Sequence, residues 1–209
     1  MFDILSVLNG KWGDGTRPKD LYKQHVIKSP KIYVETITKG LTSTNKKVQN
    51  GSAEIASLLS EEHPYLLYPH IQLFIDNLDS KTPILRWEAV CSLGNLAKVD
   101  DNKVLPSVIP LMIPFLSNKS IVLQGHTIRA LAKIAKQYPD NASHILTNLI
   151  ESAEYFPGNR VGFLVEAMVY FTDNKDLNIK ALNFVEQYIE NDVKVVQRKA
   201  RKVMKILQK

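Results

Sequence analysis

The side chains that most often bind metals or transfer protons are scattered along this chain of 209 residues. The five histidines are His25, His63, His70, His126 and His144. Two prolines separate His63 from His70, and no cysteine or carboxylate joins this pair at the spacing of zinc ligands. The sequence therefore predicts neither a metal site nor a cofactor.

Motifs for nucleophilic catalysis and phosphate binding are also missing from the sequence. There is no Gly-x-Ser-x-Gly or Ser-x-x-Lys setting for a nucleophile. The acidic pairs at 61–62 and 100–101 fall in expected turns, where carboxylates usually face a helix dipole or solvent. The segment 10–15 has three glycines and Lys11, but it lacks the Gly-Lys-Ser/Thr ending of a phosphate-binding loop. We therefore expect a protein that is not an enzyme.

Cations recur beside the apolar stripes of several expected helices. The candidate binding residues are Arg86, Trp87, Arg129, Lys133, Lys136, Lys194, Arg198, Arg201 and Lys205. A continuous basic row would attract an acidic protein surface or a phosphate backbone. The alternative is that these cations only solvate exposed helix faces, and that the last helix is basic because cations suit a helix C-terminus. Trp87 has two interpretations, a half-buried packing residue or an exposed anchor for a partner.

The helix expected at 84–97 has the clearest pattern in the chain, and Pro83 provides its start signal. Its apolar stripe contains Ala89, Val90, Leu93, Gly94, Leu96 and Ala97. Its opposite side carries Glu88, Cys91, Asn95 and Lys98. The same pattern returns at 122–135, where Ile128 takes the place of Val90, and more weakly at 48–59 and 196–207. A period of roughly 35 to 40 residues made of helix pairs is typical of an α-solenoid.

Three features make the chain similar to HEAT repeats, which are close relatives of armadillo repeats. First helices carry prolines near their start, at 64 and 69 and at 106 and 110. The polar turn 79–83 precedes a second helix of the Leu-Arg-x-x-Ala-Val-x-x-Leu-Gly-x-Leu type at 85–96. The resemblance implies an all-α fold, a right-handed α-α superhelix of about five helix pairs. It also implies that Asp79 pairs with Arg86 and Asp192 with Arg198, although the third repeat has Ser117 and Gln124 at these positions.

The resemblance also sets the expected organisation of the chain. Residues 1–28 are expected to form an N-terminal capping segment, and residues 29–209 the repeat domain. The expected repeats are 30–60, 64–98, 103–137, 141–172 and 176–208.

Composition limits the environment in which we expect the protein to work. The single cysteine cannot form an internal disulfide, which fits a reducing compartment. The N-terminus lacks the basic leader of a secretory signal, and no apolar stretch is long enough to span a bilayer. We therefore expect a cytoplasmic protein, or a nuclear one in a eukaryote. The net charge of +6 favours anionic partners.

The leading hypothesis is a non-enzymatic scaffold or adaptor that binds a protein partner, with an acidic surface favoured, through the concave face formed by second helices. We expect no membrane and no small-molecule cofactor among its partners. The alternative is a nucleic-acid-binding protein resembling the HEAT-like DNA alkylpurine glycosylases. In that case Trp87, Tyr170 and Asp173 are the residues of interest, but the catalytic roles of that family match no motif here.

Overall fold

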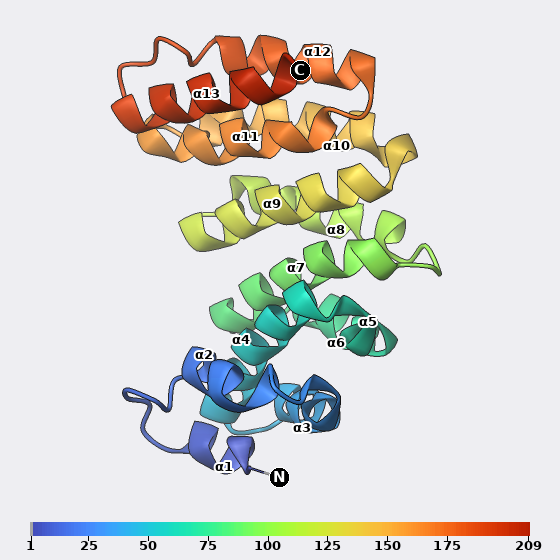
Figure 1. The fold of residues 1–209 in the computed structure, drawn as a ribbon, viewed down its shortest axis with the longest axis vertical. Coiled ribbons are helices and arrows are strands. Elements are labelled where there is room, and N and C mark those ends of the chain that lie inside the picture. Colours follow the sequence, from blue (N-terminus) through green and yellow to red (C-terminus); the bar gives the residue numbers. More distant parts are fainter. Residues whose placement is uncertain (1) are drawn as a thin grey trace. The chain divides into compact units, whose positions relative to one another are not determined.

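The computed structural model describes residues 2–209, and all regular structure in this range is helical (Figure 1). No helix within the described range is both long and apolar enough to cross a membrane. The chain divides into two compact units between Lys103 and Val104, which we call the N-terminal and C-terminal units.

The N-terminal unit contains a short leading segment and two helix pairs. Its leading segment consists of α1 (Ile4–Asn9), α2 (Pro18–Leu21) and the π-helical turn η1 (Tyr22–Val26). The first pair is α3 (Pro30–Leu41) with α4 (Lys46–Glu62). The second pair is α5 (Pro64–Leu67), η2 (Tyr68–His70) and α6 (Ile71–Asn77) with α7 (Pro83–Leu96), which ends in the 3-10 turn η3 (Ala97–Val99).

Local sequence signals explain where these helices begin. Helices α2, α3, α5 and α7 each start with a proline, whose missing N–H costs no helical hydrogen bond in the first turn. Helix α4 starts after Asn45, whose side-chain oxygen accepts hydrogen bonds from the backbone N–H of Lys47 (2.9 Å) and Val48 (3.3 Å).

Helix α7 packs against α4 and α6, and the apolar stripe predicted for it is buried. The prediction that Asn95 lies on the exposed side is wrong, since only 4% of this residue is accessible. Its side-chain amide donates hydrogen bonds to Ser60 Oγ (2.9 Å) and to the Ser57 carbonyl (3.5 Å), both on α4. The polar amide is stable inside because α4 supplies these acceptors.

The leading segment lies against α4 (Figure 1). A Cβ atom on Gly51 of α4 would overlap the Leu8 side chain, so the glycine lets α1 approach closely. The Trp12 side chain also lies beside Gly51, and its Nε1–H donates to the Leu8 carbonyl (2.9 Å). These are contacts that a capping segment would make, while the division into a cap and a repeat domain stays a prediction.

The C-terminal unit contains three further helix pairs. The first is η4 (Leu105–Ser107), α8 (Ile109–Met112) and η5 (Ile113–Ser117) with α9 (Ile121–Gln137). The second is α10 (Pro139–Glu151) and η6 (Ser152–Tyr155) with η7 (Gly158–Val161), α11 (Gly162–Ala167) and η8 (Met168–Phe171). The third is α12 (Lys175–Glu186) with α13 (Lys194–Leu207). The two units together confirm the predicted five helix pairs.

One expected helix of the C-terminal unit is broken into short turns. The sequence predicts a continuous helix at 104–116, but Pro106, Pro110 and Pro114 each remove a backbone donor there. The segment therefore alternates between 3-10 and α geometry, while five of its apolar side chains remain buried: Leu105, Val108, Ile109, Met112 and Leu116.

Candidate binding pocket on the C-terminal unit

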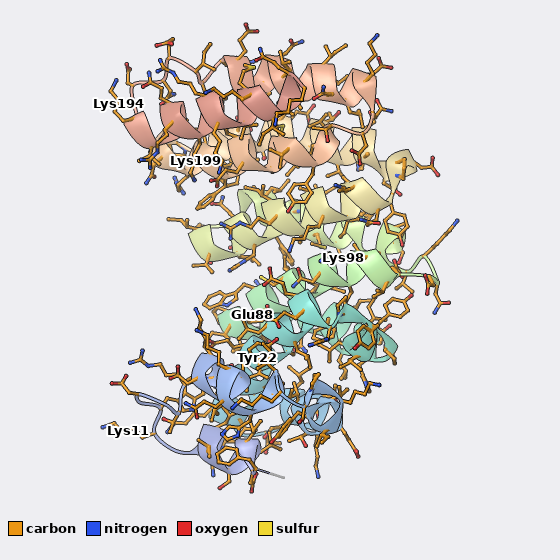
Figure 2. All side chains as sticks on the ribbon, viewed as in Figure 1. Lys11, Tyr22, Glu88, Lys98, Lys194 and Lys199 are labelled. Carbon is orange, nitrogen blue, oxygen red and sulfur yellow. The ribbon has the colours of Figure 1, made fainter. Side chains whose placement is uncertain are left out.

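Helices α9, α11 and α13 lie side by side within the C-terminal unit, with α11 in contact with both of the others. A pocket of about 350 Å³ opens on the surface that they form. It is lined by Arg129, Phe163, Glu166, Ala167, Val169, Tyr170, Lys199, Lys202, Val203 and Ile206. Figure 2 shows Lys199 on α13, where this helix faces α11. Three separate repeats therefore contribute to one site.

Phe163 on α11 brings two cations together. The Arg129 guanidinium carbon lies 5.6 Å from the centre of the Phe163 ring, and Lys199 Nζ lies 5.5 Å from it. Both distances are within the range of cation–π attraction. Gly162 contributes by leaving room for the Lys199 side chain, since a Cβ atom there would come within 3.0 Å of Lys199 Cδ. Cation–π attraction to this ring therefore places one cation from α9 and one from α13 beside the pocket.

The three cations of the pocket differ in what they already bind. Lys199 Nζ forms an ion pair with Glu166 at 2.9 Å. Within residues 2–209, no carboxylate forms an ion pair with Arg129 or Lys202, and both side chains are exposed. The pocket therefore carries a net positive charge, supplied by Arg129 and Lys202.

The remaining lining is largely apolar. Val203 is buried, Tyr170 is half-buried, and Ile206 has 38% of its surface exposed. Together with Phe163, these side chains give the pocket an apolar wall beside its cations.

His126 lies one turn before Arg129 on α9 and does not add to this charge. Burial lowers the pKa of His126, and the nearby Arg129 charge lowers it further. The imidazole is therefore neutral at pH 7.

Of the nine predicted binding residues, Arg129 lines this pocket. Arg198, Arg201 and Lys205 are each one residue before Lys199, Lys202 and Ile206, and one residue corresponds to about 100° around a helix. Arg201 points to the preceding turn, where it binds Glu190 Oε1 (2.8 Å) and the Ile189 carbonyl (3.1 Å).

The other predicted residues of the C-terminal unit lie outside this pocket. Lys194 is exposed at the first turn of α13 (Figure 2), and Lys133 is half-buried on α9. Lys136 lines a separate cavity of about 140 Å³ together with Tyr170 and Asp173. The structure does not place these cations in one continuous row with Arg129, and their binding role stays a prediction.

Arg86 and Trp87 belong to the N-terminal unit. Arg86 donates from Nη2 to the Ser80 carbonyl at 2.6 Å, which fixes the turn before α7; its pairing with Asp79 stays a prediction. Trp87 is half-buried and donates its Nε1–H to Glu88 Oε1 at 3.2 Å. Burial raises the pKa of Glu88, against the opposing effect of hydrogen bonds from Ser57 and Trp87.

The sequence analysis did not single out Phe163, Lys199 and Lys202, because they meet Arg129 only through the packing of three helices that are far apart in the sequence. The residues of α13 that are buried are Val196, Ala200, Val203 and Leu207. Their spacing is a regular helical stripe that was readable in the sequence. Lys199 and Lys202 flank this stripe and line the pocket together with residues of α11.

These features together define an all-α, armadillo-like α-solenoid, as the sequence predicts. No family model matches the sequence, and no curated protein matches it. A designed armadillo repeat protein has 15% identity and a TM-score of 0.69, with 98% of each chain covered. A second, in complex with the peptide (KR)4, has 16% identity and a TM-score of 0.70, again over 98% of each chain. A third structure, from work on a phosphorylation switch in the interaction between cadherin and beta-catenin, has 14% identity and a TM-score of 0.57, covering 98% of this chain and 44% of that one. At these identities the likeness shows the fold.

Proposed function

We propose that this protein is a non-enzymatic scaffold that binds a segment of a protein partner on the surface of α9, α11 and α13. The observation that carries the proposal is the pocket on this surface, where two cations without ion-pair partners stand beside exposed apolar surface. Adjacent helices of a solenoid form extended surfaces suited to a peptide segment. Arginine and tyrosine, both present in the pocket, are residue types enriched at interaction hot spots.

The fold gives the proposal further support, because one of the similar designed proteins was solved with a bound peptide, (KR)4. That peptide is basic, whereas the pocket of this chain is basic itself, so we expect a partner of the opposite charge. Of the ten residues that line the pocket, Glu166 is the one carboxylate, and its pairing with Lys199 suits positioning better than proton transfer.

Selection from a random dodecapeptide phage library on the immobilised full-length chain tests this function. We expect enriched peptides to bind the chain in solution with micromolar Kd, measured by isothermal titration calorimetry. No enrichment over a blank surface, together with salt-sensitive binding of a duplex DNA fragment, would favour the nucleic-acid alternative and contradict the scaffold.

A further inference from the structure

We infer that the pocket recognises an acidic segment in which one large apolar side chain is flanked, two positions away on each side, by carboxylates. The apolar side chain fills the pocket, and the carboxylates bind Arg129 and Lys202. This inference rests on the proposed function and specifies the chemistry of the partner.

The size and lining of the pocket define the central residue. A volume of about 350 Å³ is near the lower limit of ligand pockets, which span about 300–1,000 Å³. Its lining offers Phe163, Tyr170, Val203 and Ile206 to an apolar group. One leucine-sized or phenylalanine-sized side chain gains the burial of its own surface and also covers the exposed part of Ile206.

The charges define the flanking residues. Lys199 is already paired with Glu166, so Arg129 and Lys202 are the cations available to a partner. They come from α9 and α13, the helices that contact α11 and its Phe163. A segment that crosses these three helices therefore meets one cation before and one after the apolar site.

The separation of the cations sets the spacing. The charged heads of Arg129 and Lys199 lie 5.6 and 5.5 Å from the ring centre, so they are at most about 11 Å apart. Lys202 is on the same helix as Lys199, one turn further along. One further turn of α13 adds about 5 Å to this limit, and four residues of an extended chain, at about 3.3 Å each, cover about 13 Å, so about four residues can connect the two carboxylates. The pattern Glu-x-Leu-x-Glu satisfies this distance.

The probe is a fluorescein-labelled Gly/Ser peptide with Glu-Ser-Leu-Ser-Glu at its centre, titrated by fluorescence anisotropy with the full-length chain. Replacing both Glu by Gln is expected to raise Kd about tenfold on the wild type and to have little effect on Arg129→Ala/Lys202→Ala. Replacing Leu by Ser is expected to weaken binding to the wild type but not to Ile206→Ser. The matched control is Lys175→Ala/Lys180→Ala, which removes two exposed cations from α12 and should change Kd far less than Arg129→Ala/Lys202→Ala.

Three results with these peptides and variants would each overturn the inference. They are equal binding of the Glu and Gln peptides to the wild type, equal binding of the Leu and Ser peptides, or an equal loss in the α12 control. If circular dichroism shows that Arg129→Ala/Lys202→Ala does not fold, the test uses the wild type and a peptide in which both Glu are replaced by Lys. Tight binding of this peptide would contradict the inference. Phage-selected peptides that bind independently of Arg129 and Lys202 would overturn this pattern and leave the scaffold standing. Absence of any selected peptide, together with salt-sensitive binding of duplex DNA, would overturn both.

Discussion

Asn95 shows how a single polar residue fixes the contact between two repeats of the N-terminal unit. Its amide donates to Ser60 Oγ, which in turn donates to the Ser57 carbonyl at 2.7 Å. Asn95→Ala is expected to lower the free energy of unfolding by about 1–3 kcal/mol, because the buried Ser60 loses its donor. Urea denaturation followed by circular dichroism measures this. The exposed Asn159→Ala should change stability by less than about 0.5 kcal/mol, and an equal loss in both variants would refute the role of Asn95.

Glu88 makes the stability of the fold depend on pH. Burial raises its pKa above the ordinary 4.5, so the folded protein holds the proton more tightly than the unfolded chain. Stability is therefore lost as the pH rises from about 4.5 through the folded pKa, and the loss is complete above it. Glu88→Gln keeps an acceptor for Trp87 but avoids this loss.

The expected result is a gain in Tm of Glu88→Gln over the wild type that grows between pH 4 and pH 7, measured by thermal denaturation. Glu35→Gln, at an exposed position of α3, should show no such growth. A constant difference across this range would contradict the assigned cause.

At the scale of elements, two glycines in second helices test how closely the neighbouring segments pack. A Cβ atom on Gly51 of α4 would overlap Leu8 and come within 3.1 Å of Trp12, whereas one on Gly125 of α9 would stay 3.7 Å from Phe163. We expect Gly51→Ala to lower the free energy of unfolding by about 1–3 kcal/mol through overpacking. Gly125→Ala should be neutral, or stabilising by up to about 1 kcal/mol, because alanine favours helix. Chemical denaturation of both variants measures the contrast, and equal effects would contradict the packing described for α1.

The elements were largely predictable from sequence because their signals are local. Prolines at first turns and the Asn45 cap mark the helix starts, and the apolar stripe of α7 identifies its inner face. The orientation of Asn95 was not predictable, because the acceptors that make its burial favourable come from α4, more than thirty residues earlier. The inner face of α13 was also predictable, because Val196, Ala200, Val203 and Leu207 recur at helical spacing and are buried.

At the scale of the whole molecule, charge is unevenly distributed. Residues 104–209 contain 14 Lys and Arg and 9 Asp and Glu, so they carry five of the six net positive charges of the chain. Helix α13 alone has six cations and no acidic residue. Such a field accelerates the approach of an acidic ligand, and salt screens it.

We therefore expect the association rate of the Glu-Ser-Leu-Ser-Glu peptide to fall about tenfold or more between 0.1 and 1 M ionic strength, as the screening length shrinks from about 10 to about 3 Å. Stopped-flow fluorescence measures this rate. The peptide with Gln for Glu should show a flat profile, and parallel profiles for the two peptides would argue against electrostatic steering.

The repeating apolar pattern was sufficient to predict the class of fold, because every helix pair must bury the same face. The pocket was less accessible to such reasoning. It depends on Arg129, Phe163 and Lys202, which belong to three different repeats and meet only through the packing of α9, α11 and α13.

The central claim is that a partner segment binds on the surface of α9, α11 and α13. Titration of the ¹⁵N-labelled full-length chain with the Glu-Ser-Leu-Ser-Glu peptide, followed by ¹H–¹⁵N chemical-shift mapping, tests this. We expect the largest shifts at Arg129, Phe163 and Lys202 and at their neighbours on α9, α11 and α13. Shifts centred on the N-terminal unit, or none at millimolar peptide, would contradict this claim.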